Sequence, residues 1–438
     1  MKWYGTDMGR AEARGNDDYR TRIADGELDE FMAGLPAISI EGPRGVGKTL
    51  TAERRAATVH RLDDSDNLVI AQADPARLVA GERPILIDEW QRLPASFDRV
   101  RRAVDDGAGA GDFLLTGSAT PTDLPVHSGA GRIVRLRLRP MTLVERGHGS
   151  PTVSLARLFE RDRSQLYGQS EIDLEGYVEE ILTSGFPGIR RVPLQLREAQ
   201  LDSYVDHIVE RDFDELDHQV RKPATLRRWM AAYAAATATT TSLEKIRDAA
   251  TSDLGEVPAK QTTLPYRDVL QRLWILDPVD PWLPTRNRLS RLTSPVKHHL
   301  ADPALAARLL GVDAEALLRP RPVGPRIPRD GTLLGALFES LTTLCLRVYA
   351  QALGARIAHL RTWRGEHEVD LIVERGQSVV AFEVKLGGTA SDSDVKHLLW
   401  LREQIGDELA DAVVITTGRE AYRRRDGIAV VPLALLGP

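Results

Sequence analysis

The fold of the first part of this chain is decided by the stretch Gly42-Pro43-Arg44-Gly45-Val46-Gly47-Lys48-Thr49. It fits the pattern G-x-x-x-x-G-K-[ST] and stands between an apolar run, residues 37–41, and a helical pattern. Glycines let the backbone wrap a phosphate closely and turn its N–H groups inward, and the following helix N-terminus adds partial positive charge. We predict that all eight residues contact a nucleotide. Lys48 would reach the β- and γ-phosphates, and the Thr49 hydroxyl would bind Mg²⁺.

A second run, PILIDE (residues 84–89), places two carboxylates directly after a short aliphatic strand. At the phosphate edge of a sheet, Asp88 would hold Mg²⁺ through water, and Glu89 would orient or deprotonate the attacking water. The alternative is an ordinary strand end that happens to be acidic. We expect Glu89 to be catalytic together with Lys48.

A third run, DFLLTGS (residues 112–118), ends in hydroxyl groups. Thr116 or Ser118 would sense the γ-phosphate from the neighbouring strand, unless this is a turn that merely uses Ser and Gly. Arg132 would supply a finger-type positive charge to the nucleotide in cis or in trans. The alternative for Arg132 is an ordinary surface arginine.

Short apolar runs alternate with helical patterns between residues 37 and 139, which predicts an α/β fold with a parallel sheet and helices on both faces. We expect strands in the runs at 37–40, 67–73, 84–88, 112–117 and 132–138. Residues 1–23 are predicted to be a polar lead-in and residues 24–145 the P-loop core. Residues 146–222 show no strong strand signal and are predicted to form an all-helical lid.

The pattern of predicted secondary structure changes in residues 223–318. Three helical patterns are followed by WILDPVDPWLP (residues 274–284), which we interpret as two short strands around a Pro-rich turn. Three helices and a hairpin are typical of a winged helix-turn-helix. A plain helical bundle, or a winged helix used only for packing, remains open. A Pro- and Arg-rich stretch, residues 319–331, is predicted to be a linker.

Residues 332–438 form a separate unit with the predicted order helix, strand, hairpin, helix, strand. Within the hairpin, Asp370, Glu383 and Lys385 follow the pattern of the PD-(D/E)xK nuclease fold. Asp370 and Glu383 would coordinate a divalent cation, Mg²⁺ or Mn²⁺, and Lys385 would position water. Glu339, in the preceding helix, would add a third carboxylate. The alternative is a nuclease-like fold retained only for docking a partner.

The motifs GPRGVGKT, PILIDEWQ, FLLTGSA and SGAGR resemble those of bacterial and archaeal AAA-type ATPases that carry a C-terminal domain of unknown function. The resemblance extends to SGFP (184–187), VERDF (209–213) and HHLADPALAARLLG (298–311), which we interpret as packing or interdomain elements. It implies an ATPase core, a helical lid, a winged helix and a restriction-endonuclease-like C-terminal fold.

The composition limits the function further. The 438 residues carry a net charge of −5 and one cysteine, which excludes a uniformly basic nucleic-acid coat and an internal disulfide framework. We expect a cytoplasmic protein without a membrane span that hydrolyses ATP and couples nucleotide state to a nuclease-like domain acting on or binding DNA or RNA. The alternative is a nucleotide-driven switch or DNA-binding regulator. A protein partner or self-association also stays open.

Overall fold

The computed structural model describes residues 19–119, 131–148, 151–162, 164–213, 223–250, 260–282, 295–319, 333–362 and 365–438. Residues 1–18 of the predicted lead-in, residues 320–331 of the predicted linker and residues 128–130 of the SGAGR motif lie outside this part of the chain.

A five-stranded sheet forms the first domain, with the strand order β2-β3-β4-β1-β5 and all neighbouring strands parallel. The predicted parallel sheet is therefore confirmed. Its strands are β1 (Ala37–Glu41), β2 (Thr58–Arg61), β3 (Ile85–Asp88), β4 (Phe113–Gly117) and β5 (Val134–Arg137). The helices of this domain are α1 (Ile23–Gly34), α2 (Lys48–Glu53), α3 (Ser65–Ala73) and α4 (Ala95–Asp105), with short 3-10 turns at Pro75–Val79 and Trp90–Arg92.

One predicted strand is wrong. The apolar run at 67–73 lies in helix α3, because the Asp64 carboxylate caps the N-terminus by accepting hydrogen bonds from the backbone of Asp66 and Asn67. The strand at this edge is instead β2, whose residues Thr58–Arg61 are half-buried or exposed. A short polar edge strand carries too little apolar signal to be found by hydrophobic patterning.

Both faces of the sheet are buried, which explains the continuous apolar runs of the central strands. Ile38 and Ile40 of β1 pack in the large core that also contains the helical region and the C-terminal domain. Ile85 and Ile87 of β3 face a separate core with Phe97 of α4. β1 lies inside the sheet, so the loop that follows it opens between neighbouring strands.

The next region is helical, with one turn of π-helix at Ile208–Asp212. Its helices are α6 (Leu174–Thr183), α7 (Pro187–Arg190), α8 (Leu194–His207), α9 (Pro223–Ala235), α10 (Leu243–Ala249), α11 (Lys260–Arg272), α13 (Pro303–Leu309) and α14 (Ala314–Leu318).

The predicted hairpin inside residues 274–284 is wrong. Leu276 and Val279 form antiparallel bridges with Leu300 and Lys297, so the second arm comes from residues 297–300. We call these two paired segments, 276–282 and 295–300, the paired arm. The first arm therefore pairs with a later segment of the chain and not with the residues directly after the Pro-rich turn. The winged-helix interpretation stays a prediction.

The C-terminal domain contains a six-stranded mixed sheet in the order β11-β12-β10-β9-β8-β7. Its strands are β7 (Arg356–Arg361), β8 (Glu368–Arg375), β9 (Ser378–Val384), β10 (Leu409–Thr416), β11 (Tyr422–Arg423) and β12 (Ala429–Pro432). Helix α15 (Leu333–Ala352) covers one face and α16 (Asp392–Ile405) covers the other. The helix–strand–hairpin–helix–strand order expected from the sequence is present.

Residues 151–173 depart from the predicted all-helical lid. They contain β6 (Val153–Ser154), which pairs in parallel with β13 (Leu436–Gly437), and the short α5 (Leu155–Leu158). The backbone of Ser170 also donates to Arg419 O at 2.7 Å. This segment therefore runs along the C-terminal domain, and the contiguous helical region begins with α6.

A buried carboxylate joins three parts of the chain. Asp277 of the paired arm lies 3.1 Å from Arg137 and 3.0 Å from Arg139, which end the first sheet, and 3.1 Å from Arg347 of α15. Although burial alone would raise it, these arginines hold the pKa of Asp277 well below its usual range.

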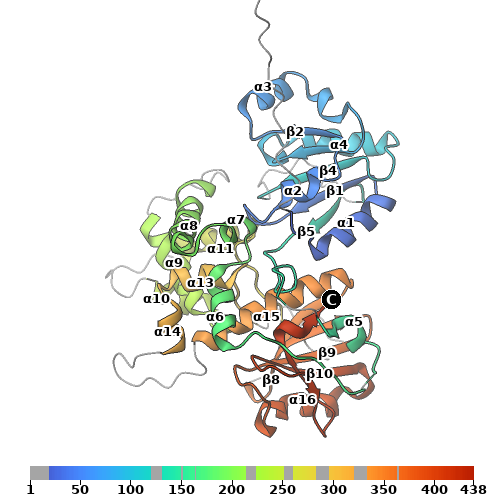
Figure 1. Ribbon diagram of the computed structural model, residues 1–438. Coiled ribbons are helices and arrows are strands. Elements are labelled where there is room, and N and C mark those ends of the chain that lie inside the picture. The colour runs from blue at the N-terminus through green and yellow to red at the C-terminus, as the bar shows by residue number, and fades with distance from the viewer. Residues whose placement is uncertain are drawn as a thin grey trace, which may run out of the picture.

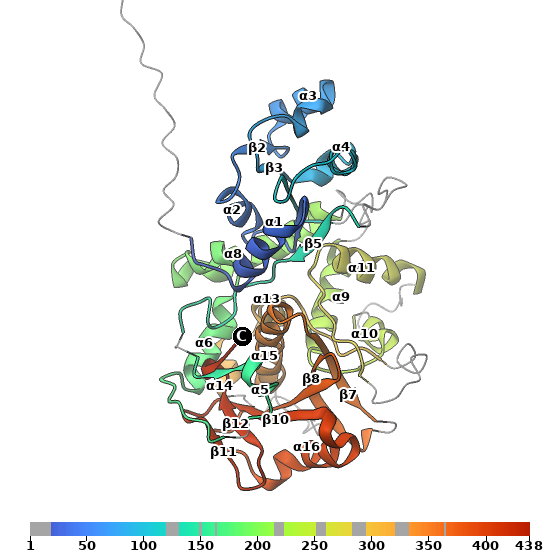
Figure 2. The same ribbon diagram turned by 90° about the vertical axis from the view of Figure 1, so that its right-hand side faces the viewer.

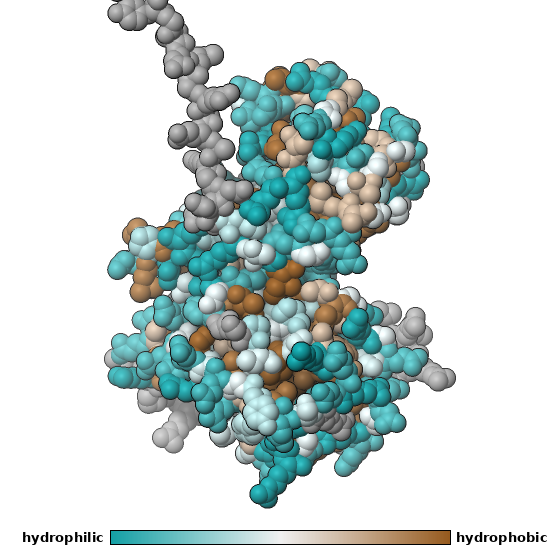
Figure 3. Space-filling model, turned by 45° about the vertical axis from the view of Figure 1, so that its right-hand side comes forward, coloured by the Kyte–Doolittle hydropathy of each residue, from teal (hydrophilic) through white to brown (hydrophobic). Residues whose placement is uncertain are grey.

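The first domain forms an upper lobe, and the helical region and C-terminal domain form a lower body around α15 (Figures 1 and 2). On the face in Figure 3 the surface is mostly hydrophilic, with apolar residues gathered near the waist between the two parts. Helix α15 is long and apolar enough to cross a membrane, but most of it is buried as the core helix of this lower body.

Candidate nucleotide-binding site

The loop between β1 and α2 has the backbone form of a phosphate cradle. Gly47 has φ 104°, in the left-handed region, and is the residue before α2. At Gly42 a Cβ atom would lie 2.1 Å from the carbonyl oxygen of Leu138, so a side chain is excluded. The Lys48 Nζ lies inside this loop and donates to the carbonyls of Gly42 and Pro43 at 2.9 and 3.0 Å. Burial lowers the pKa of Lys48 to about 8.

Asp88, at the end of β3, faces the start of α2. Its Oδ1 accepts a hydrogen bond from the Thr49 hydroxyl at 2.8 Å and another from the Thr116 hydroxyl of β4. Burial raises the pKa of Asp88. Three neighbouring elements thus bring together three residues that the sequence assigned to one site. A hydroxyl and a carboxylate are oxygen ligands that suit Mg²⁺.

Glu89 occupies a left-handed backbone conformation, φ 53° and ψ 47°, which turns the chain sharply after β3. Its Oε2 accepts a hydrogen bond from the Ser118 hydroxyl at 2.8 Å and one from the Gln91 side chain. The Glu89 backbone N–H donates to Thr116 Oγ1 at 3.3 Å. Glu89 thus contacts both hydroxyls predicted as sensors, Ser118 through its carboxylate and Thr116 through its backbone, and Gln91 is an additional member of this group.

Arg132 does not reach this loop within the same chain. It precedes β5 at the edge where the parallel strands begin, whereas the phosphate loop follows the end of β1. Its Nε donates to Asp105, at the end of α4, at 2.8 Å. The cis part of the finger prediction is therefore wrong, because Arg132 and the loop lie at opposite strand ends. The trans part stays a prediction.

Arg44, in the middle of the loop, points to the helical region. It forms an ion pair with Asp212 at 3.0 Å and contacts the ring of His207. The Tyr204 hydroxyl donates to the Arg44 carbonyl at 3.0 Å. Sequence reasoning placed Arg44 only against the nucleotide and interpreted VERDF as packing. No spacing rule connects two segments so far apart in the chain.

A pocket of about 340 Å³ adjoins the loop beside Gly47. Tyr19, Leu50, Met141 and Pro187 line it together with a group of arginines from the lead-in and the helical region: Arg20, Arg22, Arg190, Arg191 and Arg197. Sequence reasoning missed this basic lining. Arginine is so frequent throughout the chain that a local group of arginines does not stand out in the sequence.

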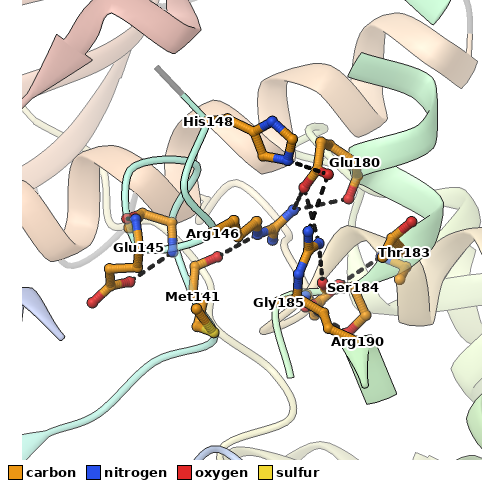
Figure 4. Close-up of polar contacts among 12 residues, drawn as sticks. Met141, Glu145, Arg146, His148, Glu180, Thr183, Ser184, Gly185 and Arg190 are labelled. Atoms are coloured by element: carbon orange, nitrogen blue, oxygen red, sulfur yellow. Dashed lines mark hydrogen bonds and ion pairs between the residues drawn. The ribbon is translucent and has the colours of Figure 1, made fainter. Parts of the chain in front are cut away.

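Arg190 is held in this pocket by a buried carboxylate (Figure 4). Glu180 of α6 accepts from Arg190 at 2.9 and 3.1 Å and from Arg146 at 3.1 Å, and its Oε1 lies 2.7 Å from His148. Burial alone would raise the pKa of Glu180, but the His148 hydrogen bond and the Arg146 and Arg190 charges hold it well below its usual range. This cluster joins the end of the first domain to the helical region.

The SGFP segment also has a structural role. Asp302 accepts hydrogen bonds from the Ser184 hydroxyl at 3.1 Å and from the Gly185 backbone at 2.6 Å. Asp302 is the residue before α13 and belongs to HHLADPALAARLLG. Two of the motifs interpreted as packing elements therefore contact each other directly.

In the C-terminal domain, Glu339, Asp370 and Glu383 are buried or nearly so, but a lysine lies among them. The Lys297 Nζ donates to Glu339 Oε1 at 2.8 Å and to Asp370 Oδ1 at 3.1 Å. Lys385 pairs with Glu383 at 2.7 Å. Burial, followed by the Asp370 charge, raises the pKa of Glu339 to about 8. We call Glu339, Asp370 and Glu383 the acidic cluster.

Within the described residues no group of three or more His, Cys, Asp or Glu side chains is arranged to hold a metal ion. The predicted metal set is therefore brought together only in part, because the Lys297 ammonium lies between two of its members. Sequence reasoning missed Lys297, which comes from the paired arm and not from the C-terminal domain.

Comparisons with known proteins assign the three regions separately. Residues 35–146 match the family described as AAA domain, in agreement with the phosphate-loop geometry described above. Residues 174–316 match a domain of unknown function, DUF8612, and residues 334–436 match another, DUF4143.

The chain is 26% identical over 424 residues to the uncharacterized proteins Rv2008c of Mycobacterium tuberculosis and Mb2031c of Mycobacterium bovis, covering 94% of this chain and 83% of each relative. Among solved structures it matches the Walker-type ATPase PABY2304 of Pyrococcus abyssi, with a TM-score of 0.39 and 14% identity, over 67% of this chain and 97% of that one.

Proposed function

We propose that the site around Lys48 binds ATP with Mg²⁺ and hydrolyses it. The observation that carries the proposal is the meeting of Thr49, Asp88 and Thr116 at one carboxylate, beside the Lys48 ammonium and the Glu89 carboxylate. These groups come from the ends of neighbouring parallel strands and the start of α2, where ligands bind in open α/β sheets.

Each residue has a role that follows from its position. Backbone N–H groups of the loop and the Lys48 ammonium bind the phosphates, and the Thr49 hydroxyl and Asp88 would hold Mg²⁺. When bound, the ion neutralises phosphate charge. Glu89 accepts the proton of the attacking water. The Ser118 hydroxyl orients the Glu89 carboxylate, and the Thr116 hydroxyl orients Asp88. The basic pocket beside Gly47 would receive the rest of the nucleotide.

The test is phosphate release from ATP and Mg²⁺ by wild type and Glu89→Gln, with exposed Glu82→Gln as the matched control. We expect Glu89→Gln to retain ATP binding and to lose about 100-fold or more in turnover, the usual scale of a general base. Wild-type turnover in Glu89→Gln would remove the assigned base. Absence of ATP binding in wild type would remove the function.

We propose further that ATP state is transmitted from the loop to the helical region, because Arg44 belongs to the loop yet pairs with Asp212. Arg190 provides a second connection, since it lines the pocket and binds Glu180. A nucleotide that rearranges either arginine also changes a contact of the lower body.

For the C-terminal domain, the position of Lys297 favours the alternative of a docking or switching role over constant cleavage. DNA or RNA as its partner stays a prediction. A cleavage assay with Mg²⁺ or Mn²⁺ on several nucleic acids, with Lys385→Ala as control, tests this. We expect no cleavage by wild type as it is folded here. Cleavage that depends on Lys385 would establish the nuclease instead.

A further inference from the structure

Lys297 neutralises the acidic cluster from outside the C-terminal domain. Its side chain is 1% exposed and lies 2.8 Å from Glu339, 3.1 Å from Asp370 and 3.6 Å from Glu368. Asp370 Oδ2 accepts a further hydrogen bond from the Val384 backbone at 2.9 Å. Carboxylates from two elements of the C-terminal domain, α15 and β8, thus converge on a cation that another region supplies.

The acidic cluster has one carboxylate oxygen that is free to bind a cation. Glu383 is 6% exposed, and its Oε1 pairs with Lys385. Within the described part of the chain, Glu383 Oε2 is buried without a hydrogen-bond partner. A buried carboxylate oxygen left unpaired is costly, and it is the ligand type that hard divalent cations take.

The backbone of Lys297 is held in the paired arm. Lys297 exchanges backbone hydrogen bonds with Val279 at 2.8 and 2.9 Å. Further along the same arm, the Trp282 backbone donates to His359 O of β7 at 2.6 Å. The paired arm is therefore attached to the edge of the C-terminal sheet, and a movement of the 295–300 segment would carry Lys297 away from the cluster.

We infer that the acidic cluster is a cation site that is filled here by the Lys297 ammonium, and that Lys297 and a divalent cation exclude each other. Both need Glu339 Oε1 and Asp370 Oδ1, and two cations that shared these oxygens inside the protein would repel each other strongly. The helical region thus controls access of metal to the C-terminal domain. The inference goes beyond the ATPase and does not depend on it.

The experiment counts Mn²⁺ bound to full-length, EDTA-treated, nucleotide-free protein by electron paramagnetic resonance. We compare wild type, Lys297→Met, and Lys297→Met combined with Asp370→Asn. Met keeps the length of the side chain without its charge. We expect Lys297→Met to bind one additional Mn²⁺ with an affinity at least about tenfold above wild type, a difference of about 1.4 kcal/mol, and the double variant to lose it. Equal Mn²⁺ binding by wild type and a folded Lys297→Met overturns the inference.

Asp370→Asn in the wild-type background provides an arm that does not need Lys297→Met to fold. If Lys297 fills the site, this substitution leaves Mn²⁺ binding unchanged. If wild type already holds Mn²⁺ there, Asp370→Asn removes one bound ion, and the inference falls. Circular dichroism of each variant establishes that it is folded before the ions are counted.

Discussion

Arg44 Nη1 and Asp212 Oδ1 lie 3.0 Å apart, although one belongs to the phosphate loop and the other to a π-helical turn in the helical region. Arg44 is 34% exposed and Asp212 is 7% exposed, so the pair is only partly shielded from water. Its contribution to stability is correspondingly small. Its position, however, connects the nucleotide loop to the lower body.

We expect Arg44→Ala and Asp212→Asn each to reduce ATP turnover. The turnover of the double variant should be no lower than that of the less active single variant, because both residues act through one contact. Their coupling in the free energy of unfolding should be about 0.5–1 kcal/mol, as for partly exposed pairs. The measurements are phosphate release and urea unfolding, with the surface pair Arg227–Asp206 as control. Additive losses in turnover would show that the two residues act separately.

Lys48→Ala should weaken ATP binding by about 100-fold or more, because charge-assisted contacts to phosphate contribute about 1.5–3 kcal/mol each. Calorimetric titration with ATP and Mg²⁺ measures this. The exposed Lys245→Ala is the matched control and should bind like wild type. An unchanged dissociation constant in Lys48→Ala would contradict the assignment of the loop.

The Glu180 cluster predicts a pH dependence of stability. The pKa of Glu180 is held below its ordinary value of 4.5, so this carboxylate stabilises the fold above that pH and loses its contribution as pH falls further. Glu180→Gln should cost about 3 kcal/mol near pH 7, since it removes a buried partner of two arginines. The gap between wild type and variant should shrink from pH 4.5 downwards. Urea unfolding from pH 7 to pH 3 measures it, with exposed Glu179→Gln as control, and a constant gap would count against the cluster.

Asp277→Asn should destabilise the protein by about 3–5 kcal/mol, because it leaves Arg137, Arg139 and Arg347 buried with less compensating charge. The exposed Asp268→Asn should have almost no effect. Thermal unfolding compares the two. If Asp277→Asn melts at the wild-type temperature, this carboxylate does not hold the three regions together.

The meeting of Thr49, Asp88 and Thr116 was predictable because each of the sequence signals is local. The glycine pattern, the aliphatic run before Asp88 and the hydroxyls at the end of β4 all belong to short strand-to-helix or strand-end signals, and parallel strands bring them to one edge. The helical and sheet character of most segments followed from the same periodicity. By contrast, β2 was missed because its residues are polar and half-exposed, and the α3 run was mistaken for a strand.

The contacts between regions were not predictable in this way. Lys297 meets Asp370 across 73 positions and Glu339 across 42, and nothing in the sequence near Lys297 indicates a buried cation. The same holds for Arg44 with Asp212 and for Arg190 in the pocket. These contacts depend on how the folded domains pack against each other. Neither the spacing of motifs nor the hydrophobic periodicity of the sequence contains that information.

The pairing of β6 with β13 has a practical consequence for dividing the chain. Expression of residues 332–438 alone, at the boundary that the sequence suggests, would strip Leu436 and Gly437 of their neighbouring strand and leave the carbonyl of Leu435 without the Thr152 N–H that it accepts at 3.0 Å. A soluble fragment is better sought by fusing residues 151–173 to the C-terminal part through a flexible connector. The edge strand would then be supplied by the fragment itself.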